Sequence, residues 1–280
     1  MLTIEFPKIA GLPTAVPVLT TPPPAWTARA VAELARRANV GGDVADRGAW
    51  LVAADDEATL EVFQASHSLR YMRRGERGEP RREGVIDEAR AREAADAWVH
   101  AFGPDGAQYA VHSVAEAEVL VSRGRDRAPE RFVTDLQVNF RFDIGGLPLI
   151  GPGAKMQVSV GHEGEVRGAY RFWREHRPMK EARIAPAEQA CEHFRRHPMF
   201  ARLKDGAAKA HVHSLRLGYF AEPPTEAQHV LLPTYEFRGV LATELHPHYE
   251  FVTYLPAATP DHAAIKETLR PVRRPDVVAI

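Results

Sequence analysis

The sequence predicts an α+β fold made of three successive units, each a short amphipathic helix followed by antiparallel strands. Helical periodicity recurs three times, at 27–38, 87–102 and 186–203. Short strand patterns bounded by turn residues follow each helix. Repetition of one supersecondary unit constrains the architecture more firmly than a single motif does. The predicted divisions of the chain are 1–80, 81–180 and 181–257, with a C-terminal tail at 258–280.

The first unit follows an extended segment at 2–18 and a stiff proline connector. Thr27 is suited to cap the N-terminus of the helix, and Val31, Leu34 and Ala35 form its apolar stripe. A pair of glycines ends the helical pattern. Three short apolar runs then predict strands of a small sheet, at 50–53, 60–65 and 68–72.

The second unit contains the most regular strand pattern, in which apolar and polar side chains alternate from 132 to 144. The apolar positions are Phe132, Leu136, Val138, Phe140, Phe142 and Ile144. The polar positions are Asp135, Gln137, Asn139, Arg141 and Asp143. Strict alternation predicts that one face of this strand meets a core and the other meets water or a ligand. Glycine turns then predict a hairpin with strands at 155–160 and 166–173.

The third unit starts at Pro186, a residue suited to the first turn of a helix. Its strand patterns lie at 210–221, 229–238 and 249–255. The tail that follows contains three further prolines. We therefore expect the tail to wrap around the protein or fray rather than to fold alone.

Composition argues against several classes of partner. Hydrophobic residues make up 45% of the chain and charged residues 26%, as in ordinary globular proteins, and the formal net charge is -1. A nearly neutral chain without long runs of one charge is not expected to bind nucleic acid or an anionic membrane. The single cysteine, Cys191, is expected to be a small buried hydrophobe. No secretory signal or membrane span is recognisable, so we expect a cytoplasmic protein.

Two stretches of the sequence resemble the PepSY-type domain. One is a helix rich in alanine and acids followed by GLPLIGPGAKMQVSVGHEGEVRGAYRFWR. The other comprises HVHSLRLGYFAEPP, HVLLPTYEFRG and YEFVTYLPA. The resemblance covers about residues 27–257 and is most specific at 87–175. It implies tandem units in which a helix packs on a curved antiparallel sheet, a broadly cystatin-like arrangement.

The resemblance also implies a role in peptidase inhibition or ligand sensing. Many PepSY-type proteins are secreted or anchored in a membrane, whereas this sequence shows no signal, anchor or attached protease domain. This departure from the family pattern leaves room for small-molecule chemistry.

The polar face of the strand at 132–144 is the first candidate site. Asp135, Gln137, Asn139 and Arg141 project from it at two-residue spacing. The next strand is expected to continue this face with Lys155, Gln157 and Ser159. Arg141 suits a carboxylate or enolate oxygen, because a guanidinium donates paired hydrogen bonds. The alternative is a hydrated sheet face without a ligand.

Histidines of the third unit form the second candidate. His211 and His213 alternate on one predicted strand, and His246 and His248 flank a proline. Neutral imidazoles bind zinc or copper, but no cysteine or carboxylate completes a familiar ligand spacing, so no metal is expected. His211 or His213 is suited instead to act as a general base.

Tyrosines and carboxylates of the third unit form the last candidate. Its members are Tyr219, Tyr235, Glu236, Glu250 and Tyr254. Such groups could donate and accept protons in an isomerisation or a cyclisation. The alternative is that these tyrosines are half-buried packing residues with hydrated hydroxyl groups.

Known cofactor and hydrolase motifs are absent from the sequence. It contains no Gly-x-Gly-x-x-Gly after a strand, no Walker loop, no Gly-x-Ser-x-Gly and no His-Glu-x-x-His. The sequence therefore predicts an enzyme that needs no cofactor, an isomerase or cyclase acting on an organic small molecule in a cavity between units, as in specialised metabolism. The alternative is a non-catalytic module that binds a peptide or a partner protein.

The site residues of the enzyme hypothesis fall into two groups. The predicted catalytic residues are Arg141, His213, Tyr235, Glu236 and Tyr254. The predicted substrate-binding residues are Asp135, Gln137, Asn139, His211 and Tyr219. Together they would line one apolar recess and stabilise charge that develops on a folded substrate.

Overall fold

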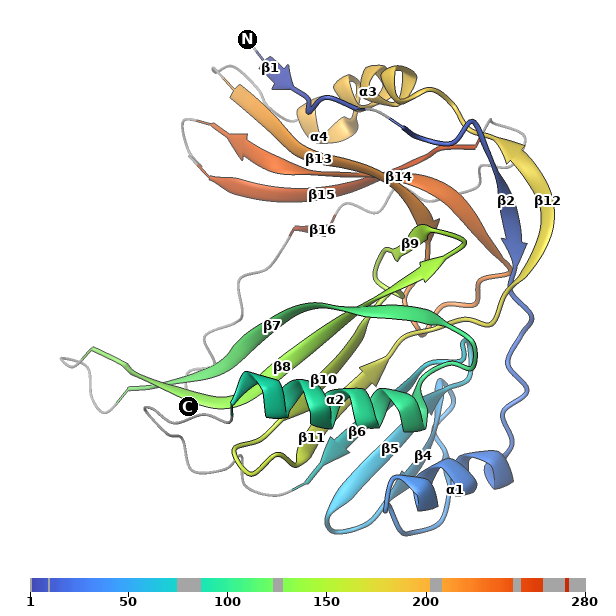
Figure 1. The fold of residues 1–280 in the computed structure, drawn as a ribbon, viewed down its shortest axis with the longest axis vertical. Coiled ribbons are helices and arrows are strands. Elements are labelled where there is room, and N and C mark those ends of the chain that lie inside the picture. Colours follow the sequence, from blue (N-terminus) through green and yellow to red (C-terminus); the bar gives the residue numbers. More distant parts are fainter. Residues whose placement is uncertain are drawn as a thin grey trace.

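The computed structural model describes residues 2–9, 11–74, 87–122, 128–201, 208–243, 248–258 and 270–271. Strands make up 50% of the structure and helices 16%. The predicted α+β fold of separate helix-on-sheet units is therefore wrong, because the strands join into one large mixed sheet. The protein is mostly β, with short helices placed against this sheet (Figure 1).

Strand pairing crosses the predicted divisions at residues 80 and 180. β6 (Leu69–Arg73) pairs with β11 (Val166–Arg171), and β9 (Leu147–Ile150) pairs with β13 (Ala208–Phe220). A small sheet left alone would present unpaired N–H and C=O groups at its edges, and pairing with the next sheet satisfies them. Local periodicity identifies strands but not their partners, so the sequence did not reveal this joining.

The helices begin where the periodicity predicts them. α1 spans Ala28–Arg37, α2 spans Glu88–Phe102 and α3 spans Ala187–Arg195. The hydroxyl oxygen of Thr27 accepts a hydrogen bond from the N–H of Ala30 at 3.1 Å, which confirms the predicted N-cap. α3 is shorter than predicted, because Pro198 lacks the N–H that would continue it and instead begins α4 (Pro198–Ala201). Within the described residues, no helix has the length and apolar character needed to cross a membrane.

The first lobe consists of α1, α2 and a sheet in the order β3-β4-β5-β6-β11-β10-β8-β7. Its remaining strands are β3 (Ala45–Asp46), β4 (Trp50–Ala54), β5 (Ala58–Phe63), β7 (Gln108–Val121), β8 (Glu130–Ile144) and β10 (Met156–Val160). α1 and α2 cover one face of this sheet and share one hydrophobic core with it. That core includes Trp98 of α2 and Phe140 of β8, which confirms the predicted apolar face of β8.

The second lobe consists of α3, α4, β13 and four further strands. These are β1 (Leu2–Glu5), β14 (Val230–Ala242), β15 (Tyr249–Pro256) and β16 (Arg270–Pro271). Phe194 of α3 is fully buried, and its ring stacks on that of Phe237 with 4.5 Å between centroids. α3 therefore covers one face of this sheet, and the opposite face turns toward the first lobe (Figure 1).

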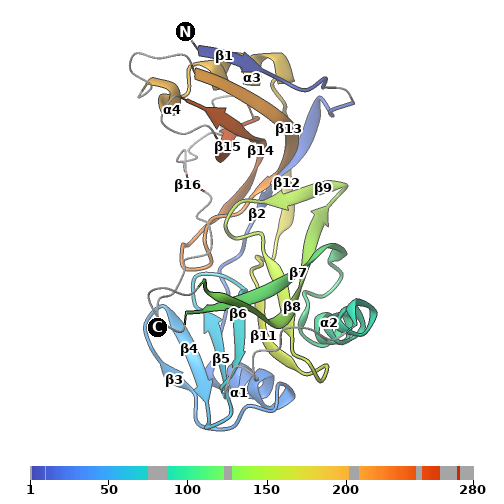
Figure 2. The same ribbon diagram turned by 90° about the vertical axis from the view of Figure 1, so that its left-hand side faces the viewer.

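The two lobes are joined by β2 (Ala15–Thr20), β9 and β12 (Arg177–Arg183), which lie between them in Figure 2. Arg174, just before β12, is only 3% exposed. Its guanidinium donates hydrogen bonds to the carbonyl oxygens of Glu222, Pro223 and Glu226 at 2.7–2.8 Å. This arginine therefore fastens the loop between β13 and β14 to the segment that leaves the first lobe.

Candidate functional site

The face of the first-lobe sheet opposite α1 and α2 carries a band of polar side chains. Strand register places Asn139, Gln157, Tyr170, Arg70 and Glu61 in one row across β8, β10, β11, β6 and β5. Directly opposed side chains in a sheet lie close enough to interact. At one end of the row, Nε of Arg70 donates to Oε2 of Glu61 at 2.6 Å.

The predicted binding residues Gln137 and Asn139 meet at Gln157, which is only 7% exposed. Nε2 of Gln157 donates to Oε1 of Gln137 at 3.0 Å and to Oδ1 of Asn139 at 2.8 Å. A buried amide needs such partners, since an unpaired one would cost free energy. These three amides therefore form a fixed platform in the middle of the polar face.

A cavity of about 760 Å³ lies at the end of the polar face beside the turn between β10 and β11. Met72, Ser159 and Gly168, which are neighbours across three strands, line it. Four carboxylates and three guanidiniums also line it, from Glu57, Asp135, Glu163, Glu165, Arg73, Arg74 and Arg167. The site is thus polar and of mixed charge, not the apolar recess predicted from the sequence.

A β-bulge in β11 directs the side chain of Arg167 toward the cavity. The pairing of β10 with β11 shifts register between Ser159 and Val160, so Arg167 is the extra residue of a β-bulge. A bulge re-aims the side chain at that position. Nε of Arg167 lies 2.6 Å from Oε1 of Glu165 and 3.6 Å from Oδ1 of Asp135.

Two polar atoms at this site lack hydrogen-bond partners among the described residues. They are Oδ1 of Asp135, an acceptor, and Nη1 of Arg167, a donor, and both are buried. Buried polar groups are nearly always paired, and each unpaired one needs an explanation. A ligand that brings a donor to Asp135 and an acceptor to Arg167 would supply that explanation.

Arg141, the predicted anion-binding catalytic residue, does not contribute to this cavity. It is exposed, and its Nε lies 3.3 Å from Oδ1 of Asp143 on its own strand. Although it shares the polar face with Asn139, it lies beyond the amide platform, toward β9. Strand alternation identified its face but not its distance from the cavity.

In the second lobe, the predicted residues Glu236 and Tyr254 are brought together with two arginines. Glu236 is 1% exposed and lies opposite Arg216 on β13 and Tyr254 on β15. Nε of Arg216 donates to Oε1 of Glu236 at 2.7 Å, and Arg238 donates to both carboxylate oxygens. Burial alone would raise the pKa of Glu236, but the hydrogen bonds from Arg238 and Arg216 outweigh it and lower the pKa.

Tyr219 and Tyr235 have structural roles instead of lining a site. Both side chains are buried, and their hydroxyl groups donate to the carbonyl oxygens of Pro17 and Ala185 at 2.7 Å. Burial raises the pKa of each phenol to about 12. Tyr235 also points to the opposite face from Glu236, because adjacent residues of a strand alternate.

His211, His213 and His248 are exposed, and the described residues contain no group of side chains that could hold a metal ion. Nδ1 of His211 is 3.2 Å from Oε2 of Glu5 on β1, and Nε2 of His248 is 3.5 Å from Oε1 of Glu250. His213 occupies an irregular position of β13, where the register shifts. His246 lies outside the described residues.

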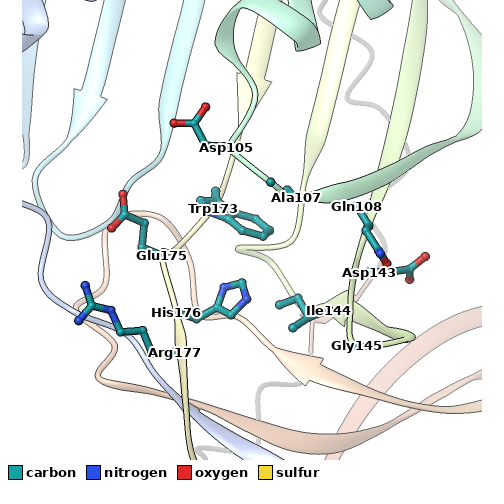
Figure 3. A pocket seen from close by; sticks show the side chains of 11 residues that line it. Asp105, Ala107, Gln108, Asp143, Ile144, Gly145, Trp173, Glu175, His176 and Arg177 are labelled. Carbon is teal, nitrogen blue, oxygen red and sulfur yellow. The ribbon is translucent and has the colours of Figure 1, made fainter.

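A second cavity, of about 380 Å³, lies where the first lobe meets β12 (Figure 3). Trp173 and His176 stand side by side in it, with their ring centroids 5.2 Å apart. Two of its carboxylates already have partners within the protein. Asp143 forms an ion pair with Arg141, and Oε1 of Glu175 lies 3.6 Å from Nε2 of His67. Unlike the first cavity, it is lined by no buried polar side-chain atom that lacks a hydrogen-bond partner among the described residues.

Sequence reasoning missed the arginines at both polar clusters. No local pattern reveals Arg167, because only the pairing of two strands creates its bulge. A signal existed for Arg238, which follows Glu236 at two-residue spacing and so shares its face. Arg216, flanked by two leucines, carries the same signal of alternation.

Comparison with known proteins supports the fold alone. No family model matches the sequence, and no curated protein matches it significantly. The structure is similar to the crystal structure, at 1.45 Å resolution, of an uncharacterized protein from Eubacterium rectale ATCC 33656. The TM-score is 0.52 at 10% sequence identity, over 90% of this chain and 87% of that chain. The PepSY resemblance stays a prediction.

Proposed function

We propose that this protein binds a small zwitterionic molecule, of the size of an amino acid or short peptide, in the first-lobe cavity. The observation that carries the proposal is that Nη1 of Arg167 and Oδ1 of Asp135, both buried, have no hydrogen-bond partner among the described residues, although Nε of Arg167 lies 3.6 Å from the same oxygen. A ligand carboxylate suits the guanidinium, and a ligand ammonium or amide N–H suits the carboxylate. The cavity volume of about 760 Å³ falls within the usual range for small-molecule sites.

The distribution of titratable groups supports binding more than proton-transfer catalysis. The predicted catalytic residues are divided between the two lobes, with Arg141 in the first and His213 and Glu236 in the second. A general acid or base works best with a pKa near the working pH. The pKa of Glu236 is lowered, and burial raises that of Tyr254 to about 12. The isomerase or cyclase predicted from the sequence is the alternative.

Binding can be measured by calorimetry with a panel of free amino acids, dipeptides and tripeptides. We expect saturable binding of at least one of them and its weakening in Asp135→Asn and Arg167→Gln. A hydrogen bond to a charged group contributes ~1.5–3 kcal/mol, so each variant should lose roughly tenfold to a hundredfold in affinity.

Arg141→Gln provides a matched control, because it removes an arginine from the same sheet face outside the cavity. Its affinity should equal that of the wild type. If no member of the panel binds, or if all three variants bind alike, the proposed function is wrong. Mass spectrometry of the same mixtures tests the alternative, since turnover of a bound compound would favour an enzyme.

Two glycines give a second test, through substitutions to alanine. A Cβ on Gly161 would overlap Oε1 of Glu165 and Nε of Arg167, the far ends of two flexible side chains. Gly161→Ala should therefore displace this ion pair and weaken ligand binding with little change in stability. A Cβ on Gly168 would lie 3.7 Å from the carbonyl oxygen of Tyr71, an ordinary contact.

Gly168→Ala is thus the matched comparison for Gly161→Ala: it adds a methyl group at the cavity wall without displacing the ion pair, so it should retain the fold and lose less affinity. Calorimetry gives the affinity, and the thermal unfolding midpoint reports stability. Equal affinities of the two variants would show that the Glu165–Arg167 pair does not shape the site.

A further inference from the structure

Each lobe carries a cluster of three charged side chains, and the signs of the charges are reversed between the two clusters. In the first lobe, Arg131 donates to two carboxylates, those of Glu116 and Glu118. In the second, the carboxylate of Glu236 accepts from two arginines, Arg216 and Arg238. The first cluster therefore has one negative charge in excess, and the second has one positive charge in excess.

Both arginines of the second cluster keep N–H groups available for a ligand. Nε of each points at Glu236, so the guanidinium planes are held in place by the same buried carboxylate. Among the described residues, Nη1 and Nη2 of Arg216 and Nη1 of Arg238 have no hydrogen-bond partner. The two side chains are 31% and 44% exposed. Their outer N–H groups can thus reach a ligand without first breaking the contacts to Glu236.

The surroundings of this pair favour an anion. The phenol of Tyr254, opposite Glu236, has its pKa raised to about 12 by burial and by its contact with Glu236, so it adds no negative charge at neutral pH. Strand register also places Glu5 and Glu250 on this face. Glu5 is paired with Lys209 and His211, and Glu250 has His248 beside it. The face lies opposite α3 and turns toward the first lobe (Figure 1).

We propose that Arg216 and Arg238 form an oxyanion-binding site on the second lobe, for the phosphate or carboxylate group of a small molecule. Guanidiniums held in a fixed orientation bind such groups through paired hydrogen bonds. Glu236 acts as a positioning residue: its carboxylate fixes the orientation of both guanidinium groups and does not touch the ligand. This site is separate from the first-lobe cavity and does not depend on the proposed function.

The test uses the full-length protein and two probes, inorganic phosphate and succinate. Side-chain Nε–Hε NMR signals of arginine are recorded during each titration, with sodium chloride at matched ionic strength as the control for screening. The signals of Arg216 and Arg238, assigned from Arg216→Gln and Arg238→Gln, should shift saturably with at least one probe. Whichever probe binds more tightly identifies the phosphate or the carboxylate as the preferred group.

Arg238→Gln should weaken the binding of that probe by about tenfold, as expected for loss of a charged hydrogen bond. Arg131→Gln is the matched control, because it removes an arginine whose charge is outweighed by two neighbouring carboxylates. Shifts that chloride reproduces, or an equal loss of binding in Arg131→Gln, would overturn the proposal. The wild-type titration decides the matter even if a variant at Arg216 fails to fold.

Discussion

Arg174→Met is expected to lower the free energy of unfolding by roughly 3 kcal/mol. Arg174 is 3% exposed, and its guanidinium serves three carbonyl oxygens of the loop between β13 and β14. Methionine keeps much of the side-chain volume but donates no hydrogen bond. Each acceptor left without a partner costs about 1–3 kcal/mol when water cannot replace the donor. Because the loop is partly exposed, water can replace some of the lost donors, and the total loss stays near the value for a single acceptor.

Urea unfolding followed by tryptophan fluorescence measures this effect. Arg177→Met is the control, because Arg177 is exposed and lies only three residues further along the chain. We expect its unfolding midpoint to stay close to that of the wild type. Equal midpoints for Arg174→Met and the wild type would show that the buried arginine does not hold the lobes together.

Glu236→Gln is expected to destabilise the protein by roughly 3 kcal/mol at pH 7. Removing one partner of a buried charge cluster leaves the others uncompensated, and ~3 kcal/mol is the lower end of the usual cost. The lower end applies because the side chains of Arg216 and Arg238 are partly exposed and can be hydrated. Urea unfolding at pH 7 gives the difference directly.

The same substitution should change the response of stability to acid. The pKa of Glu236 is lowered in the folded protein, below its ordinary value of 4.5. The stability it contributes is therefore fully present above pH 4.5 and is lost as the pH falls through the folded-state pKa. The difference between wild type and Glu236→Gln should shrink in that range. A difference that stays constant from pH 7 down to pH 3 would contradict this assignment.

Local features of the fold could be predicted from the sequence because they depend on neighbouring residues. The alternation along β8 identified its buried face, including Phe140 and Phe142. Thr27 marked the start of α1, since capping involves atoms three residues apart. The architecture could not be predicted in the same way. The pairing of β6 with β11 joins segments nearly a hundred residues apart, and no local signal specifies it.

The candidate site could be predicted only in part, for a related reason. Alternation placed Asp135, Gln137 and Asn139 on one polar face, and the structure gathers them there. It could not show that Arg167 joins them, because a bulge arises from the register of two strands. Nor could it show that the hydroxyl groups of Tyr219 and Tyr235 donate hydrogen bonds to backbone carbonyl oxygens and so are not available to a substrate.

The pairing of β1 and β2 with strands near the other end of the chain has a consequence for biosynthesis. Leu2 is the partner of Ala208, and Thr20 is the partner of Val230, whereas α1 through β11 forms one uninterrupted stretch. The first lobe is thus inserted into a second lobe whose own sequence is split in two. On the ribosome, the inserted part can fold while translation continues, but β1 and β2 must wait until the strands that receive them have emerged.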